Sequence, residues 1–271
     1  MVAKAAEKNA LPAQISSAVK DCRSGNVPLF QPKANVICLA GSVDEILLFT
    51  SRLPISNRGI VVISSEGGRV DAAIKLARWL YESRAAIVID GPCLSSCANY
   101  LVPVARQLYL TRRAVIAMHG SVPRGKHGYA MSAQVPGTEP DTAAITRRLQ
   151  EFAAIRQGLL AEETALFDLV LVDDAYLTRY VELARTATVR GKLRTTPARR
   201  ITLILDEEYL TAFGIKPIYL GGKPLQDEAI ASLGCAFFRD YLLYGFYGDL
   251  VREPAKSPPE CRQRGPSVPL F

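Results

Sequence analysis

Long apolar runs, repeats and low-complexity tracts are absent from this sequence of 271 residues. No run of about 18 apolar residues occurs, which excludes an ordinary membrane-spanning helix, and residues 1–30 lack the apolar stretch of a secretory signal. The absence of repeats and of biased composition excludes solenoids and disordered chains. Because 49% of the residues are hydrophobic, we expect a globular chain with one main domain.

Cysteine and histidine are scarce, with six and two residues respectively. Six cysteines are too few to form a disulfide scaffold for so long a chain, and their spacing matches no zinc site. No adenine- or phosphate-binding pattern is present, so we expect neither a metal nor another cofactor. Most cysteines are scattered, whereas Cys93 and Cys97 bracket two serines in the segment 93–97 (CLSSC).

Acidic residues are outnumbered by basic ones, and the formal net charge is +7. The basic residues gather over 190–200 and at Arg112 and Arg113. No aromatic platform or nucleic-acid-binding module accompanies them, so we expect a solvated surface and no nucleic-acid partner. Basic faces also meet anionic membranes, and the sequence leaves membrane association open.

Hydrophobic patterning alternates between the periods of strands and of helices. Short apolar runs each precede a turn or a segment with apolar residues at helical spacing. Such alternation indicates parallel βαβ units and an α/β fold. The expected strands are 35–40, 60–64, 85–89, 107–110 and 114–118, with turns at Gly67-Gly68 and Gly91-Pro92 and helices over 43–53, over 70–81 and from about Ser95.

The second half of the chain is more varied in pattern. Its expected elements are a Gly- and Pro-rich loop over 121–140, helices over 141–167 and 173–185, a strand over 201–205 and a short helix ending at Gly214. The aromatic stretch 237–247 is typical of docked core or of an oligomer contact. We divide the chain into an N-terminal extension (1–30), an α/β domain (31–220) and a C-terminal appendage (221–271).

Three polar segments each follow an expected parallel strand. They are 65–68 (SEGG), 91–96 (GPCLSS) and 118–120 (MHG). Sites in open parallel sheets form at the carboxyl ends of the strands, so all three segments can converge there. Each also has a simpler interpretation, as a plain turn at Gly67-Gly68, a helix N-cap at Ser95 and a structural histidine at His119.

Taken together, the three segments favour serine chemistry. Ser95 is expected at a helix start, where unpaired N–H groups favour developing negative charge. His119 is the candidate base, since a base must lie within hydrogen-bond reach of its nucleophile. The Gly67-Gly68 backbone can approach a ligand closely and contribute to an oxyanion hole. The second histidine, His127, is expected to be exposed.

The ordered series of strand, S-x-G-G, helix, strand, G-x-x-x-S, helix, strand and M-H over residues 35–120 resembles the Clp proteolytic subunit, a member of the Clp-protease/crotonase superfamily. Residues 205–215 (LDEEYLTAFGI) are similar to the late helix of that family. The resemblance implies a repeated ββα superhelix and a homo-oligomer that acts on peptide or protein substrates. It makes Ser95 the nucleophile, His119 the base, and the N–H groups of Gly68 and Ser96 the oxyanion hole, with Ser96 as the alternative nucleophile.

The sequence also departs from the family. The family's triad aspartate lies shortly before the late helix, where residues 201–205 (ITLIL) hold no carboxylate. The third triad member is therefore unknown, and a dyad, a rerouted triad and a non-catalytic oligomeric interaction protein stay open. A crotonase-type acyl-CoA enzyme is a weaker alternative. Lys75 and Lys126 are alternative candidate bases, ranked below His119. The candidates for the third triad member, by proximity in sequence only, are Asp168, Asp173, Asp174 and Asp206.

The cysteine-flanked serine resembles that of poorly characterised bacterial envelope proteins related to the Clp subunit. This resemblance implies a disulfide between Cys93 and Cys97 in an oxidising compartment. It favours a periplasmic or otherwise exported protein from which a signal has been removed, with the cytoplasm as the alternative. The other interpretation is that the two cysteines are small buried hydrophobic residues.

Overall fold

A computed structural model gives the fold and describes residues 2–24, 29–50, 59–118, 122, 142–179, 182, 200–224, 229, 233, 241–247 and 250–251. The helices are α1 (Val2–Arg23), α2 (Val43–Thr50), α3 (Val70–Ser83), the π-helix η1 (Cys97–Leu101), α4 (Thr142–Val170) and α6 (Glu207–Ala212). The strands are β1 (Leu29–Lys33), β2 (Val36–Ser42), β3 (Ile60–Gly67), β4 (Ala86–Leu94), β5 (Leu108–Thr111), β6 (Val115–Met118), β7 (Arg200–Ile204), β8 (Pro217–Leu220), β9 (Tyr241–Tyr247) and β10 (Leu250–Val251).

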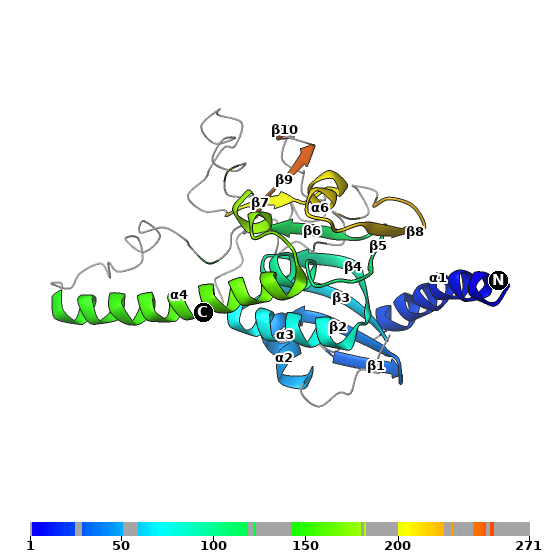
Figure 1. The fold of residues 1–271 in the computed structure, drawn as a ribbon, viewed down its shortest axis with the longest axis horizontal. Helices are drawn as coiled ribbons and strands as arrows, with labels where there is room; N and C mark the ends of the chain where they lie inside the picture. Colours follow the sequence, from blue (N-terminus) through cyan, green and yellow to red (C-terminus); the bar gives the residue numbers. More distant parts are fainter. Residues whose placement is uncertain are drawn as a thin grey trace, which may run out of the picture.

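The described strands form one mixed and mainly parallel sheet (Figure 1). Its main path runs β1-β2-β3-β4-β6-β7-β9-β10, while β5 pairs with β4 and β8 pairs with β5. The pairs β1–β2, β6–β7 and β9–β10 are antiparallel and the other pairs are parallel. The expected α/β class is confirmed.

Helices cover both faces of the first parallel strands. Alternate residues of β2, such as Ile37 and Leu39, join the core beneath α2 and α3, whereas Val36 and Cys38 pack with Ile15 of α1 on the opposite face. This alternation follows from the two-residue repeat of a strand. Burial on both faces explains why these strands read as continuous apolar runs in the sequence.

Strand β4 changes neighbours half way along its length. Its first half pairs with β5 through Ile87 and Leu108, and its second half pairs with β6 through Cys93 and Ile116. Gly91 lies between the halves with φ +123°, a value that favours glycine. The turn expected at Gly91-Pro92 was wrong, because the chain bends there without leaving the sheet.

Two elements outside the expected α/β domain, β9 and α1, are joined to the sheet. Strand β9, from the aromatic stretch near the C-terminus, pairs in parallel with β7. At the other end, a disulfide joins Cys22 of α1 to Cys38 of β2. The Arg23 guanidinium donates two hydrogen bonds, of 2.8 and 2.7 Å, to the carboxylate of Asp90. Helix α1 is thus fixed to β2 and β4 by one covalent and one ionic link.

Asp90 is a carboxylate buried within the sheet. Its Oδ1 also accepts a hydrogen bond of 2.8 Å from the Thr111 hydroxyl, and Arg113 lies 4.0 Å away. Burial alone would raise the pKa of Asp90, but the hydrogen bonds from Arg23 and Thr111 and the nearby positive charges outweigh burial and lower the pKa. The buried charge is therefore stabilised by its partners.

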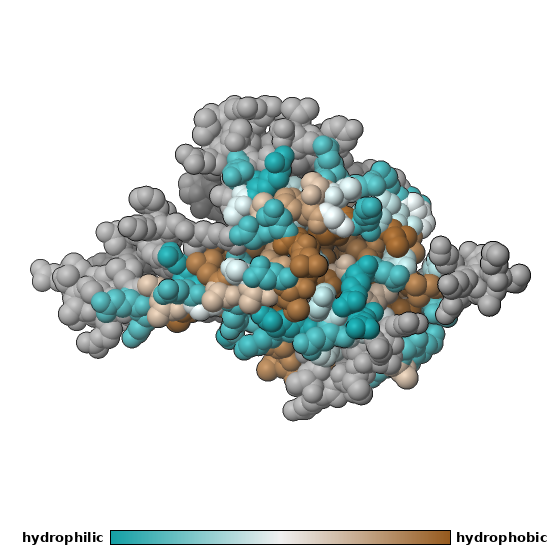
Figure 2. Space-filling model, viewed as in Figure 1, coloured by the Kyte–Doolittle hydropathy of each residue, from teal (hydrophilic) through white to brown (hydrophobic). Residues whose placement is uncertain are grey.

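Hydrophilic residues cover most of the described surface on the face drawn in Figure 2, with hydrophobic residues gathered near its middle. The large hydrophobic residues that are exposed come from α2, α4, the residue after α4, and β8, namely Leu48, Ile155, Leu169, Leu171 and Ile218. Within the described part of the chain, no helix combines the length and the apolar character needed to cross a bilayer.

Substituting Asp90→Asn is expected to lower the free energy of unfolding by about 1 to 3 kcal/mol at pH 7, because hydrogen bonds to a charged group are lost. The folded-state pKa of Asp90 is lowered, so the contribution is present above the unfolded value of about 4 and disappears as the pH falls through the folded value. Urea unfolding at pH 7 and near pH 3 measures both effects.

The matched control is Asp21→Asn, which removes the exposed ion pair with Lys33 and is expected to cost less than about 1 kcal/mol. Equal losses in the two variants, or a loss for Asp90→Asn that does not shrink in acid, would contradict the role given to Asp90.

Candidate functional site

The carboxyl ends of β3, β4 and β6 lie side by side. Cys93 of β4 is in register with Ser65 of β3 and with Ile116 of β6, and Leu94 is in register with Ala117. The segments 65–68 and 91–96 therefore meet at one edge of the sheet. The third segment begins with Met118, the last residue of β6; His119 and Gly120 lie outside the described residues.

Ser95 occupies the turn between β4 and η1. Its φ is +56°, a left-handed conformation that is uncommon for a residue with a side chain. Its N–H donates to the Ala117 carbonyl at 2.9 Å, and its carbonyl accepts from the Asn99 N–H at 2.9 Å. The side chain is partly exposed. The helix expected to start at about Ser95 starts at Cys97 and is a single π-turn, too short for a large helix dipole.

Gly67 is the residue that lets this turn approach β3. A Cβ atom at Gly67 would lie 2.6 Å from the Leu94 carbonyl oxygen and 2.8 Å from the Cβ of Ser95. Since the first contact is with backbone, a larger residue would have to displace the turn. The φ of +91° at Gly67 independently favours glycine.

Ser96 and Gly68 join the two strand ends through a hydrogen bond. The Ser96 hydroxyl is almost fully buried and donates to the Gly68 carbonyl at 3.1 Å. Its hydrogen is therefore engaged in a bond within the fold, which favours Ser95 over Ser96 as the candidate nucleophile. Gly68 itself is exposed, and the next N–H, that of Arg69, donates to Asp44 Oδ2 at 3.0 Å.

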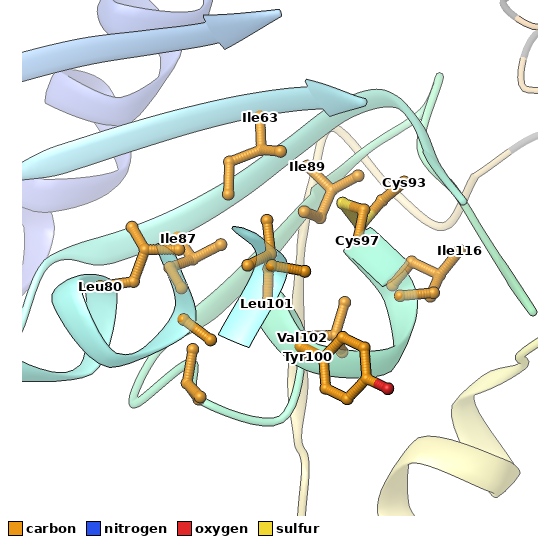
Figure 3. Close-up of a cluster of buried hydrophobic side chains, with 14 of the residues drawn as sticks. Ile63, Leu80, Ile87, Ile89, Cys93, Cys97, Tyr100, Leu101, Val102 and Ile116 are labelled. Atoms are coloured by element: carbon orange, nitrogen blue, oxygen red, sulfur yellow. A yellow bond between two sulfur atoms is a disulfide. The ribbon is translucent and has the colours of Figure 1, made fainter. Parts of the chain in front are cut away.

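A disulfide encloses the serine turn. It joins Cys93, near the end of β4, to Cys97, the first residue of η1, with the Cα atoms 5.2 Å apart. Both cysteines are fully buried, and they lie among the side chains of Ile63, Ile89 and Ile116 (Figure 3). The two cysteines are therefore part of the core as well as of the turn.

Polar side chains buried behind η1 were missed in the sequence. The Tyr176 hydroxyl donates to the Ala98 carbonyl at 2.9 Å, and the Tyr100 hydroxyl donates to Glu163 Oε2 at 2.7 Å. Burial, with the neighbouring Tyr209, raises the pKa of Tyr176 well above its ordinary value, so this hydroxyl keeps its proton. Glu163 is fully buried, and its helical spacing from Leu166 and Phe167 was the available signal.

The structure describes all four carboxylates suggested by sequence proximity. Asp168, Asp173 and Asp174 are exposed. Asp206 follows Leu205, whose N–H donates to the Ile116 carbonyl, and its Oδ1 caps α6 by accepting from the Tyr209 N–H at 2.8 Å. At about 3.3 Å per strand residue, Asp206 is about 10 Å from the level of Met118.

Thr202 is a buried polar residue that β7 brings to the Met118 end of β6. Leu203 pairs with Met118, and β7 runs antiparallel to β6. Thr202 therefore lies one residue beyond the level of Met118. It is fully buried, and its hydroxyl has no hydrogen-bond partner among the described residues. The stretch 201–205, which holds no carboxylate, thus places a neutral hydroxyl near this end of the sheet.

The other candidate residues named from the sequence are the two lysines and the second histidine. Lys75 is exposed on α3, and Lys126 and His127 lie outside the described residues, as do residues 121 and 123–140 of the expected long loop. In the described segments, no group of three or more His, Cys, Asp or Glu side chains is placed to hold a metal ion. The described site therefore consists of Ser95 and the backbone that surrounds it.

Comparison with known proteins finds no protein-family model and no curated protein that match the chain.

Replacing Gly67 by alanine is expected to destabilise the protein by about 1 to 2 kcal/mol through its positive φ and by a further ~1 to 3 kcal/mol through overpacking. Gly214→Ala is the matched control, because Gly214 has a φ of +77° but a Cβ atom there would meet no described atom within 4 Å. Chemical denaturation of both variants separates packing from backbone strain. A Gly67→Ala loss no larger than that of Gly214→Ala would contradict the close contact with the serine turn.

Proposed function

We propose that the chain is a serine hydrolase in which the Ser95 hydroxyl attacks a carbonyl carbon and forms an acyl-enzyme. The left-handed conformation of Ser95, φ +56°, is the observation that carries the proposal. In one large class of serine hydrolases the nucleophile sits on a sharp, strained turn between a strand and a helix, because such a turn exposes Oγ. A serine that only caps a helix adopts an extended conformation, so capping does not account for the strain.

His119 is the proposed general base. The Ser95 N–H is bonded to the carbonyl of Ala117, and His119 follows Ala117 by two residues in the sequence. Because consecutive Cα atoms are about 3.8 Å apart, chain connectivity keeps the imidazole in the neighbourhood of the serine. A positioned histidine base typically contributes ~10² to 10⁴ in rate.

The N–H groups of Gly68 and Ser96 are the proposed oxyanion hole. Gly68 has an exposed backbone, and Ser96 directly follows the nucleophile. The hydrogen bond from the Ser96 hydroxyl to the Gly68 carbonyl fixes these two residues relative to each other, and preorganised donors do not have to reorient during the reaction. One such donor typically contributes ~10² to 10³ in rate.

We further propose that the sheet is the ββα superhelix of the Clp-protease/crotonase superfamily and that the substrate is a peptide or protein. The change of neighbours half way along β4 supports the first point, because it divides β4 into two strand segments that precede η1. A homo-oligomer is part of the same proposal. The two disulfides, Cys22–Cys38 and Cys93–Cys97, support an exported protein, because disulfides persist in oxidising compartments.

The second candidate function is a non-catalytic interaction protein that keeps the fold and assembles with copies of itself. The buried hydroxyl of Thr202 is the observation that favours it, because a carboxylate normally holds the base histidine in the productive tautomer. Removing that carboxylate from a serine protease lowers the rate by about 10⁴. Reaction of Ser95 with an electrophilic probe would favour the hydrolase, whereas an unreactive Ser95 would favour the interaction protein.

The direct test is labelling by a fluorophosphonate probe. The oxidised full-length chain is expected to be labelled, Ser95→Ala is expected to lose all labelling, and His119→Ala is expected to be labelled ~10² to 10⁴ times more slowly. Gel fluorescence against time gives the rates. Ser83→Ala is the control, because Ser83 lies at the end of α3, where its hydroxyl bonds to the Leu80 carbonyl.

Labelling that persists in Ser95→Ala, or that never occurs in the parent, would overturn the proposed function. Loss of labelling in Ser96→Ala with retention in Ser95→Ala would move the nucleophile to the neighbouring residue.

A further inference from the structure

The disulfide around Ser95 has a different setting from the one at the start of the chain. Cys22–Cys38 joins α1 to the face of β2 that is remote from the serine turn. Cys93–Cys97 joins two residues only four positions apart, and the strained serine lies between them. One disulfide fixes a helix to the sheet, whereas the other closes a ring around the candidate nucleophile.

This ring restricts the conformations that the serine turn can adopt. Four residues of extended chain span up to about 13 Å, whereas the Cα atoms of Cys93 and Cys97 are 5.2 Å apart. Relaxing Ser95 to an extended conformation would move these two Cα atoms apart. The covalent link therefore opposes the motion that would release the left-handed conformation.

Hydrogen bonds hold the same turn, but each is individually weaker than a covalent link. Ser95 is bonded through its N–H to Ala117 and through its carbonyl to Asn99, and the Ser96 hydroxyl is bonded to Gly68. These bonds join the turn to β6, to η1 and to Gly68, the residue after β3. The disulfide connects the strand before Ser95 directly to the helix after it, and it does so covalently.

Because Cys93 and Cys97 are buried, their disulfide and their reduced pair of thiols would pack differently in the core. Both cysteines are fully buried in a close-packed cluster with Ile89 and Ile116 (Figure 3). Two separate thiols need more room than two bonded sulfur atoms, and close-packed cores respond to added volume by shifting backbone. The segment 94–96 is the backbone between the two cysteines, so a shift of either cysteine would displace Ser95.

We propose that the Cys93–Cys97 disulfide is a positioning device for Ser95, so that the serine is fully reactive only when the disulfide is formed. The proposal rests on the proposed hydrolase function. Reduction by a dithiol transfers two electrons and two protons to the disulfide, which yields two cysteine thiols and the oxidised cyclic disulfide of the reductant. Reoxidation by a small-molecule disulfide reverses the exchange and restores the turn.

The first test compares two double variants of the full-length chain. Cys93→Ala/Cys97→Ala is expected to slow the maximal rate of Ser95 labelling by a fluorophosphonate about 10- to 100-fold, as expected for a misplaced reacting group. The probe concentration for half-maximal rate is expected to change little. Cys22→Ala/Cys38→Ala is the matched control and is expected to keep the parent rate within about twofold, since it removes the disulfide away from the turn. Thermal melting of each variant shows that it is folded.

The second test needs no substitution at the serine turn. A variant with alanine at the other four cysteines, Cys22, Cys38, Cys235 and Cys261, keeps only Cys93 and Cys97. Its labelling rate is expected to fall as dithiothreitol reduces the disulfide, in proportion to the free thiols counted by alkylation and mass spectrometry, and to return on reoxidation with oxidised glutathione.

The outcomes separate this inference from the proposed function. Labelling at the parent rate in folded Cys93→Ala/Cys97→Ala, or in the fully reduced four-alanine variant, would overturn the positioning role and leave the hydrolase intact. An oxidised parent that never reacts would overturn both. A slower rate that recovers on reoxidation supports both.

Discussion

Contact between the glycine backbone at the end of β3 and the serine turn at the end of β4 is the constraint on which the candidate site depends. Gly67 has no Cβ, and any Cβ there would meet the Leu94 carbonyl and the Ser95 side chain. The contact sets how closely two parallel strands approach at their carboxyl ends. It also places the Gly67 backbone next to the side chain of Ser95.

The rest of the fold supports this junction from both sides. Cys93 and Cys97 close the turn on the core side, and the hydroxyl of Tyr176 bonds to Ala98 in the helix that follows. On the far face of the sheet, α1 is fixed by the Arg23–Asp90 ion pair. Strain at one residue is tolerated because the surrounding structure determines its conformation several times over.

Much of the fold followed from the sequence, because apolar periodicity reports directly on strands and helices. The elements at 35–40, 60–64 and 141–167 are present in the structure as expected, since one dominant spacing marks each. Gly91-Pro92 gave the wrong prediction, because the same residues that make turns also let a buried strand bend. The convergence of 65–68 with 91–96 could be predicted from their places after parallel strands.

The details of the site depend on contacts that a linear pattern does not contain. The left-handed conformation of Ser95 and the burial of Ser96 depend on packing at the ends of β3 and β4, and the motif that made Ser95 the expected nucleophile contains neither feature. Likewise, the Cys22–Cys38 link and the buried Glu163 involve partners that are distant in the sequence. Local chemistry was therefore predictable, whereas the roles of neighbouring residues required the fold.

The most direct measurement is a crystal structure of the oxidised protein after reaction with a phosphonate. We predict a covalent bond from phosphorus to Ser95 Oγ, with the phosphonyl oxygen about 2.7 to 3.1 Å from the N–H nitrogens of Gly68 and Ser96. We also predict a ring nitrogen of His119 within about 3.5 Å of the serine oxygen. Phosphorus bound to another residue, or a phosphonyl oxygen that faces away from both N–H groups, would contradict these predictions.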